Sequence, residues 1–293
     1  MSKLPDSQLV LNTDGSIYHL KLHPGQLAKN IIVVGDPNRV PVVSKYFDSV
    51  DLEVSNREIV THTGRIGNTE VSVMSTGMGT DNIDIVINEI DALFNINLES
   101  REIKNDLTSL NIIRLGTSGA LQADIPVEDS FVASEFGLGL DGLIQFYDVK
   151  KGLVNHEMTQ AFMDHVHWHK DFPVPYIVEG SKELLETLGK GLYKGITATA
   201  PGFYGPQGRR LRVPLRAPEM NELIESFNFE GCRVSNFEME TSALYGLGGH
   251  MGHNMLTMCA IIANRVTEKF NPNYKQSVEK LIQLTLERLS EKY

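Results

Sequence analysis

The chain has 293 residues, of which 41% are hydrophobic and 22% are charged, and its formal net charge is −10. This composition is typical of a globular protein with a large core, and the negative charge argues against a general nucleic-acid binder or a binder of anionic membranes. The N-terminus lacks a basic region followed by an apolar core, and no apolar run approaches the ~20 residues of a membrane span, so we expect a cytoplasmic protein.

Short β-branched runs predict strands, in chain order, at residues 30–35, 71–77, 111–120, 129–137, 195–202, 232–239 and 255–266. Amphipathic patterns predict helices at 80–94 and 277–293. Strands that alternate with helices indicate an α/β fold with a central mixed β-sheet flanked by helices. No shift in composition marks a boundary, so we expect a single domain over residues 1–293, of which roughly the first 15 residues form an extended arm.

Three of the predicted strands run into glycine-containing turns that could hold an anion. They are "GDPNR" at 35–39, "GMG" at 77–79 and "RLGTSG" at 114–119. Ligands of α/β sheets collect at the carboxyl ends of strands, where backbone N–H groups and arginines can surround a phosphate. Glycine-rich turns are also common without a ligand, and none of these turns has the pattern of a dinucleotide-binding loop or of a P-loop that binds nucleoside triphosphates. The pattern favours anion binding but names no reaction.

A pair of carboxylates precedes an apolar run of small residues in "SNFEMETSAL" at 235–244. A buried carboxylate is costly unless it is paired or binds a ligand, so Glu238 and Glu240 need partners. For Glu238 the sequence leaves a structural and a functional interpretation open.

We predict no metal site. Cys232 and Cys259 are the only cysteines and have no CxxC spacing, which favours structural thiols. The alternating His165, His167 and His169 would align on one face of a strand, where zinc is conceivable. Because no second ligand cluster accompanies them, we favour a surface or interface role.

Five segments, in this order and spacing, resemble the nucleoside phosphorylase family. They are "VVGDPNRV", "STGMGTDN", "RLGTSGAL", "FYGPQGR" and "SNFEMETSAL", and the resemblance extends from about residue 18 to the last predicted helix. It is greatest to the members that cleave uridine. The resemblance implies reversible phosphorolysis, in which phosphate attacks the ribose C1′ of uridine and releases uracil and ribose 1-phosphate.

The resemblance also assigns roles to residues. It implies a phosphate site of Gly35, Arg39, Arg114, Gly116 and Thr117, with Arg57 supplied by a neighbouring subunit. The ribose would contact Thr117, Met239 and Glu240, and His19 from across the interface. The base would contact Phe203, Gln207, Arg209 and Arg265. Within this set, Arg39, Arg114, Arg209 and Glu240 would carry the catalysis.

These residue types suit the reaction. Cleavage of the N-glycosidic bond builds positive charge on the ribose and negative charge on the base, so arginines that orient phosphate and a guanidinium at the base edge both stabilise the transition state. Inorganic phosphate is a co-substrate, and no cofactor is expected. Some relatives hold a monovalent cation at their dimer interface through a Glu and a Ser; Glu58 matches the first, but Asn82 replaces the second, so we do not predict this ion. The expected partner is a second copy of the chain, in a dimer or hexamer.

The sequence leaves open alternatives for the base of the nucleoside and for the nucleophile of the reaction. Purine-cleaving relatives use a Ser-Asp pair where this chain has Asn264-Arg265, which argues against a purine substrate. A nucleoside hydrolase would not need the arginine set, and neither would a non-catalytic nucleoside-binding protein. The additional loop arginines Arg210, Arg212 and Arg216 could shape a lid or be solvated charges, and we favour solvated charges. Broader specificity for thymidine, deoxyuridine or purine nucleosides stays open.

Overall fold

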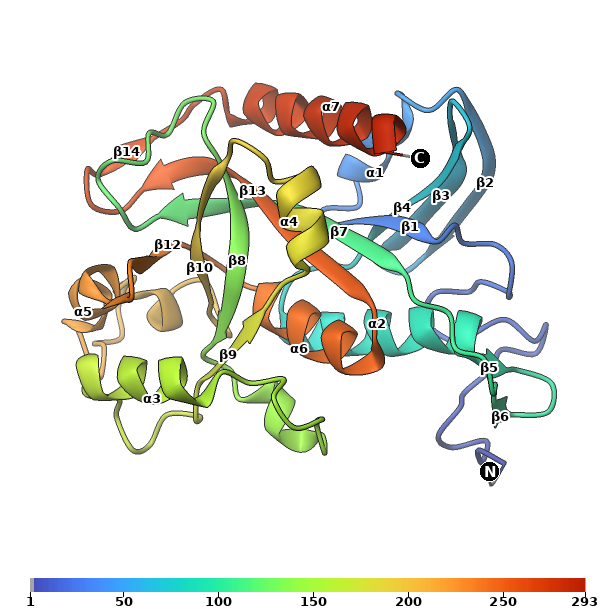
Figure 1. The fold of residues 1–293 in the computed structure, drawn as a ribbon, viewed down its shortest axis with the longest axis horizontal. Coiled ribbons are helices and arrows are strands. Elements are labelled where there is room, and N and C mark those ends of the chain that lie inside the picture. The colour runs from blue at the N-terminus through green and yellow to red at the C-terminus, as the bar shows by residue number, and fades with distance from the viewer. Residues whose placement is uncertain (1–2, 293) are drawn as a thin grey trace.

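The computed structural model describes residues 3–292, in which a twelve-stranded mixed sheet runs through the molecule (Figure 1). Its central strands are β1 (Asn30–Val34), β4 (Thr69–Ser75), β7 (Asn111–Ala120), β8 (Phe131–Gly139), β10 (Tyr193–Thr199), β12 (Cys232–Glu238) and β13 (Asn254–Asn264). These seven coincide with the seven predicted strands, and the predicted α/β fold with a mixed sheet is confirmed.

The parallel pairing of three central strands brings their carboxyl ends together. The order is β12-β10-β8-β13-β7-β1-β4, in which β1 runs parallel to both β4 and β7, and β13 runs parallel to β7. Residues Ile32, Val73 and Ile113 share one register across three strands and are fully buried. The carboxyl ends of β1, β4 and β7 therefore meet at one edge of the sheet, as parallel strands require.

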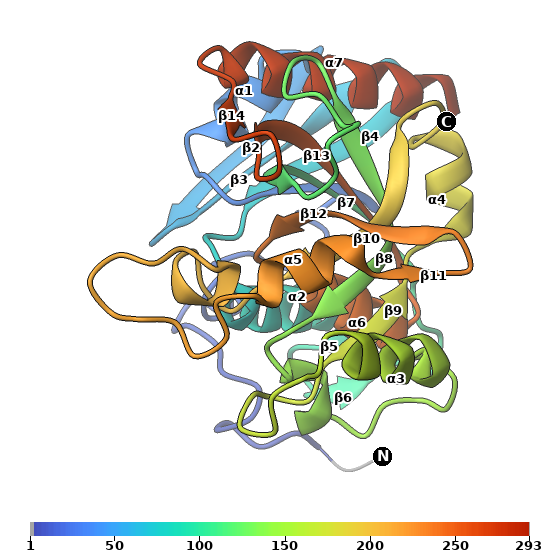
Figure 2. The same ribbon diagram turned by 90° about the vertical axis from the view of Figure 1, so that its left-hand side faces the viewer.

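Five further strands complete the sheet (Figure 2). They are β2 (Ser49–Asn56), β3 (Ile59–Ile66), β9 (Tyr176–Glu179), β11 (Asn228–Phe229) and β14 (Lys269–Phe270). A separate hairpin is formed by β5 (Ile96–Asn97) and β6 (Glu102–Ile103) within the charged segment at 97–109. These strands are not predicted from the sequence, because they are short or, as in β2, alternate exposed polar with half-buried residues.

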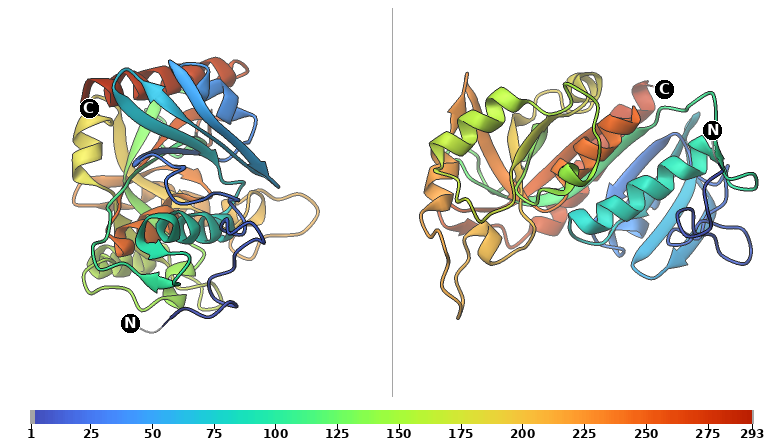
Figure 3. Two further views of the ribbon diagram at one scale, coloured as in Figure 1. Left: turned by 90° about the vertical axis from the view of Figure 1, so that its right-hand side faces the viewer. Right: turned by 90° about the horizontal axis from the view of Figure 1, so that it is seen from below.

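Helices cover both faces of the sheet (Figures 1 and 3). The helices are α1 (Arg39–Ser44), α2 (Thr80–Asn95), α3 (His156–His165), α4 (Lys182–Thr187), α5 (Met220–Ser226), α6 (Thr241–Met251) and α7 (Tyr274–Lys292), with single 3₁₀ turns η1 (Leu143–Phe146) and η2 (Gly205–Gln207). Helices α2 and α6 pack on one face, whereas α1, α4 and α7 pack on the other. Of these, α2 and α7 were predicted from periodicity, because each has one buried apolar face, which includes Ile83 and Ile87 in α2 and Leu281 in α7.

The N-terminal segment lies against the rest of the chain. Leu9 and Ile17 are buried, and the Arg101 side chain donates a hydrogen bond of 2.6 Å to the Leu9 carbonyl oxygen. In addition, the Leu4 N–H donates to the Arg101 carbonyl oxygen at 2.9 Å. Over the described residues, none of the helices has the length and apolar character needed to cross a membrane.

Candidate active site

A cavity of about 660 Å³ opens at the edge where β1, β4, β7 and β12 end. A volume of this size is typical of small-molecule sites. Nine of the residues that the sequence assigned to a site line it: Gly35, Arg39, Arg114, Thr117, Phe203, Gln207, Arg209, Met239 and Glu240. Gly116, Arg57, His19 and Arg265 do not line this cavity.

Arg114 forms the centre of a buried charge cluster. Its side chain is 7% exposed, its Nη2 forms an ion pair with Glu240, and its Nη1 lies 3.2 Å from Glu238 Oε2. The same Nη1 lies 3.4 Å from the Cys259 sulfur. Burial opposes the charge of Arg114, but Glu240 and Glu238 outweigh it and raise its pKa, so Arg114 stays a cation.

Glu238 ends β12 and fixes the turn into α6. Its carboxylate accepts hydrogen bonds from the Thr199 hydroxyl at 2.7 Å, from the Glu240 N–H at 2.9 Å and from the Thr241 N–H at 3.0 Å. The last two donors belong to the first turn of α6, whose N–H groups have no partner within the helix. Glu238 therefore stabilises the start of α6 and sets the backbone position of Glu240.

Glu240 projects from the N-cap position of α6 into the cavity. Its Oε1 accepts a hydrogen bond of 2.8 Å from the Gly79 N–H, while its other oxygen faces Arg114. Gly79 has a φ of 98°, so the turn after β4 needs glycine there to present this N–H. Burial raises the pKa of Glu240, and the attraction of Arg114 opposes that rise. A ligand diol that replaces either contact would find a carboxylate already fixed in position.

The segment 116–119 belongs to strand β7, which continues to Ala120. It does not form the glycine-containing turn that was predicted to follow Arg114. Its glycine has another function. A Cβ at Gly116 would collide with the Arg114 guanidinium and approach the Cys259 sulfur to 3.0 Å. Gly116 does not line the cavity, but because it has no side chain it leaves room for the Arg114 guanidinium that does.

Arg39 begins α1 and is the second cation of the cavity. Its Nη1 donates to the Leu115 carbonyl oxygen at 3.0 Å, and no carboxylate lies within ion-pair distance of it among residues 3–292. Burial lowers the pKa of Arg39, and the positive charge of Arg114 lowers it further. Two cations that disfavour each other in this way would both be stabilised by an anion bound beside them.

The opposite wall is the loop after β10. The Arg209 guanidinium lies 3.8 Å from the centroid of the Phe203 ring and donates to the Gln207 side-chain oxygen at 2.6 Å. Burial and the charge of Arg265 lower the pKa of Arg209 to about 10. Arg265 itself donates to the Gln207 carbonyl oxygen at 3.0 Å, so it supports this loop from outside the cavity. The wall combines an aromatic face, an amide and a guanidinium.

Arg57 and His19 lie together on a neighbouring surface. The Arg57 guanidinium lies 5.6 Å from the centroid of the Tyr18 ring, which in turn packs edge-on against His19 at 4.8 Å. His19 Nδ1 contacts Glu89 at 2.6 Å, and its backbone N–H donates to the same carboxylate. Neither residue reaches the cavity of its own chain.

Several residues that line the cavity are not among the predicted site residues, although Met78 lies in the glycine turn at 77–79 and Glu58 was compared with a cation ligand of the relatives. Phe270 on β14 and Met78 in the turn after β4 are 60% and 74% exposed and line the cavity. Glu58 also lines it. The histidine segment at 165–169 forms the end of α3 and a turn, so the alternation expected for one strand face is not realised. Among residues 3–292 no group of three potential metal ligands comes together.

Comparisons with known proteins show to which protein family the chain is related. Residues 29–290 match the model of the phosphorylase superfamily. A uridine phosphorylase of Thermococcus kodakarensis is 31% identical over 265 residues, which cover 88% of this chain and 80% of that protein. A DeoD-type purine nucleoside phosphorylase of Tolumonas auensis is 26% identical over 244 residues, 83% of this chain and 84% of its own.

A solved structure extends the relationship to the whole fold. The nucleoside phosphorylase of Trypanosoma brucei, described as showing uridine phosphorylase activity, superposes with a TM-score of 0.86 at 30% identity, over 97% of this chain and 99% of its own. The chain therefore belongs to the phosphorylase superfamily, as an enzyme of the nucleoside phosphorylase type.

Proposed function

We propose that this enzyme catalyses the reversible phosphorolysis of uridine to uracil and ribose 1-phosphate. The observation that carries the proposal is the pairing of two unlike walls in one cavity. One wall holds Arg39, a cation without a carboxylate partner in the described chain, beside Arg114. The other holds an aromatic ring, an amide and a third guanidinium. A phosphate on the first wall and a base on the second would place the ribose C1′ between them.

The residues act on the two charges that develop. Phosphate held by Arg39, Arg114 and the Thr117 hydroxyl is the nucleophile, and its negative charge stabilises the cationic ribose ring. Glu240 accepts hydrogen bonds from the ribose hydroxyls, with Met239 against the sugar. On the opposite side, Arg209 donates to the departing uracil, whose negative charge spreads over its ring carbonyl oxygens. No proton transfer from a carboxylic acid to the base is needed.

A pyrimidine base is favoured over a purine by the end of β13. Arg265 stands where the purine-cleaving relatives have the Asp of their Ser-Asp pair, and Asn264 stands at the serine position, with its side-chain polar atoms bonded to the backbone. Its amide donates to the Gln122 and Ile125 carbonyl oxygens at 2.8 Å, and its oxygen accepts from the Val266 N–H at 3.0 Å. Asn264 therefore holds this loop in place, and the Arg265 guanidinium, which donates to the Gln207 carbonyl oxygen, cannot replace the carboxylic acid that protonates a purine. The likeness to purine phosphorylases keeps purine nucleosides in the test below.

A second copy of the chain completes the site in this proposal. Arg57 and His19 do not line the cavity of their own chain and lie in a cluster with Tyr18. Donated to a neighbour, Arg57 would add a third cation to the phosphate and His19 would reach the ribose 5′-hydroxyl. The contact of His19 Nδ1 with Glu89 leaves Nε2 as the ring nitrogen available to that hydroxyl.

The test separates reaction and substrate. Purified protein is incubated with uridine, with and without inorganic phosphate, and uridine, uracil and the sugar product are separated by chromatography. Phosphate-dependent release of uracil with ribose 1-phosphate is the expected result. Equal release without phosphate, giving free ribose, would establish a hydrolase instead. Thymidine, deoxyuridine, inosine and adenosine are run in parallel, and faster cleavage of inosine or adenosine than of uridine would overturn the pyrimidine assignment.

A further inference from the structure

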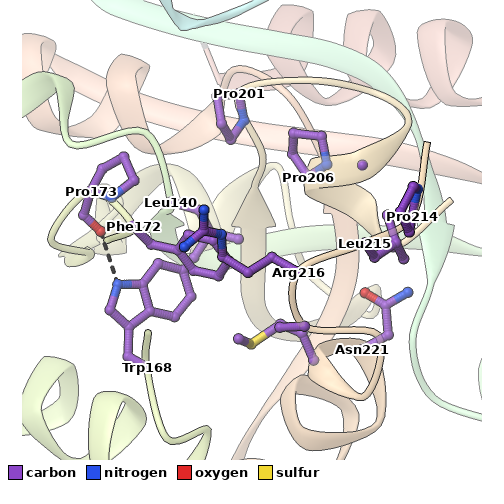
Figure 4. A pocket seen from close by; sticks show the side chains of 14 residues that line it. Leu140, Trp168, Phe172, Pro173, Pro201, Pro206, Pro214, Leu215, Arg216 and Asn221 are labelled. Carbon is purple, nitrogen blue, oxygen red and sulfur yellow. Dashed lines mark hydrogen bonds between the residues drawn. The ribbon is translucent and has the colours of Figure 1, made fainter. Parts of the chain in front are cut away.

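A second cavity, of about 380 Å³, lies behind the loop after β10 (Figure 4). This loop, residues 203–209, carries Phe203, Gln207 and Arg209 and is called the base-binding loop below. This volume falls within the range of about 300–1,000 Å³ that small-molecule sites occupy. Its walls come from the end of β8, the turn after α3 and the long segment between β10 and α5. Its apolar lining includes Leu140, Trp168, Phe172, Pro173, Pro206 and Met220.

The base-binding loop is the partition between the two cavities. Phe203, Gln207 and Arg209 line the active-site cavity, whereas Gly205, Pro206 and Gly208 line the second one. Neighbouring residues of one short segment therefore face opposite sides. An occupant of the second cavity would press on the backbone that carries the base-binding side chains.

The lining selects a flat aromatic ligand. Trp168 and Phe172 pack edge to face with centroids 5.3 Å apart, and the Trp168 N–H is already bonded to the Pro173 carbonyl oxygen at 2.9 Å. These rings offer a ligand their apolar surface and no free indole donor. Apolar and aromatic contacts would thus supply the binding energy.

One cation at the rim adds a polar requirement. Figure 4 shows the Arg216 side chain running from the arginine-containing loop toward the Trp168 side of the cavity. Its Nη1 donates to Asp171 at 2.7 Å, and its Nη2 has no partner in the described part of the chain. Since both side chains of this pair are more than half exposed, the pair is readily shared with a ligand anion.

A direct contact connects the second cavity to the base site. The Asn221 amide, which lines the second cavity, donates to the Gln207 carbonyl oxygen at 3.1 Å. The same carbonyl oxygen accepts from Arg265 on the other side. Between them, Gly208 has a φ of +68° and no room for a Cβ beside Asn221, so the backbone there is closely confined. Displacement of Asn221 would therefore be transmitted to Gln207.

We propose that this cavity is a second ligand site, for a flat aromatic molecule carrying one anionic substituent, and that its occupation changes the affinity of the base site. The binding part of the proposal is independent of the reaction. The coupling part rests on the proposed function, because it needs uridine as the ligand of the active site. Two experiments keep these parts distinguishable.

Binding is measured through Trp168, the only tryptophan of the chain. The probe is 1-anilinonaphthalene-8-sulfonate, an aromatic anion whose absorption overlaps tryptophan emission. We expect saturable quenching of Trp168 emission by one probe per protomer. Ala217→Phe, which fills the cavity from its wall, should weaken binding at least tenfold. Val213→Phe adds the same ring to the same loop at a residue that is 67% exposed and outside the lining, and should leave binding unchanged.

The anion requirement is tested with Arg216→Gln, an exposed substitution that leaves the apolar lining in place. This substitution should weaken the binding of the anionic probe several-fold but leave the binding of the uncharged analogue N-phenyl-1-naphthylamine unchanged. Non-saturable quenching, equal affinity in Ala217→Phe, or equal loss for both probes in Arg216→Gln would overturn the second site.

Coupling is measured by titrating the probe with and without saturating uridine, and uridine with and without saturating probe. Two sites that share a wall should change each other's dissociation constant by the same factor, which we expect to be at least twofold. Complete displacement of the probe by uridine would place the probe in the active site and overturn the proposal. An unchanged dissociation constant with uridine demonstrably bound would overturn the coupling. Failure of uridine to bind at all, with saturable probe binding retained, would count against the proposed function instead.

Discussion

Glu238, the last residue of β12, and Glu240, the N-cap of α6, contact the two terminal nitrogens of one guanidinium, that of Arg114. The two carboxylates differ in what else they bind. Glu238 accepts from Thr199 and from two N–H groups of α6, which leaves it committed to the protein. Both carboxylates line the cavity, but within residues 3–292 Glu240 accepts only one further hydrogen bond, from the Gly79 N–H. We infer that Glu238 positions Arg114 and Glu240, whereas Glu240 touches the substrate.

Glu238→Gln tests this division. The glutamine keeps the size of the side chain but removes the charge, and its amide places donors where N–H groups now donate. Because hydrogen bonds to a charged group contribute about 1.5–3 kcal/mol, we expect the free energy of unfolding to fall by about 2 kcal/mol, measured by urea denaturation. We also expect kcat to fall in protein that is still fully folded, since Arg114 and Glu240 lose their alignment.

The matched control for that substitution is Glu279→Gln, which removes an exposed carboxylate paired with Lys45 on the surface. Its urea midpoint and kcat should stay close to those of the parent chain. A Glu238→Gln variant with unchanged kcat would show that the charge of Glu238 has no part in the alignment of Arg114.

The base-binding wall predicts a selective loss in Arg209→Ala. Removing a donor that stabilises developing charge typically costs about 10²–10³ in rate, and the phosphate wall is untouched. We therefore expect kcat/KM for uridine to fall by about that factor, with little change in the KM for phosphate. Arg212→Ala, an exposed arginine of the same loop, is the control and should leave both constants unchanged. Equal losses in the two variants would assign the effect to the loop's overall charge.

Shared sites predict complementation between subunits. Arg39→Ala damages a site from within its own chain, whereas Arg57→Ala damages the site of the neighbour. Each variant alone should lose most activity. In dimers mixed at random, half contain both variants and one of their two sites is intact, so co-expression should recover about a quarter of the parent activity. Recovery no greater than the sum of the two variants would place Arg57 and Arg39 in the same chain's site or outside any site.

Much of the fold followed from pattern, because the central strands are buried on both faces and read as continuous apolar runs. The strands that escaped prediction, such as β2, are half exposed and depend on their neighbours for pairing. Motifs indicated which residues face the cavity, but not how they are held. Periodicity does not reveal that Glu238 contacts Arg114, because that contact depends on β12 pairing with the end of β7, a strand far away in the sequence.

Similar limits explain the glycines and the second cavity. Gly116 was interpreted as part of a turn, since glycine after a strand is usually a turn residue. Its role beside Arg114 becomes visible only when the guanidinium is seen to pass over it. The second cavity is formed by proline- and aromatic-containing segments from three parts of the chain. Local sequence patterns do not predict that these segments come together.

For the half-buried Asp141 we predict a pH response opposite to that of an exposed ion pair. Asp141 accepts hydrogen bonds from the Leu143 N–H at 2.6 Å and the Tyr176 hydroxyl at 3.1 Å, yet burial raises its pKa above the ordinary 3.8. A carboxyl whose folded pKa is raised binds its proton more tightly in the folded state. Its contribution to stability is therefore complete below pH 3.8 and is lost as the pH rises through the folded pKa.

We expect Asp141→Asn to be most destabilising at low pH and progressively less so toward neutral pH, measured as the free energy of unfolding in urea at several pH values. Asp124 is the opposite case, because its hydrogen bond to Arg233 lowers its pKa. Its contribution is present above the ordinary pKa and lost as the pH falls through the lowered one, so Asp124→Asn should be most destabilising near neutral pH. Parallel pH profiles for the two variants would mean that burial does not control the protonation of Asp141, and that the hydrogen bonds from Leu143 and Tyr176 hold it ionised.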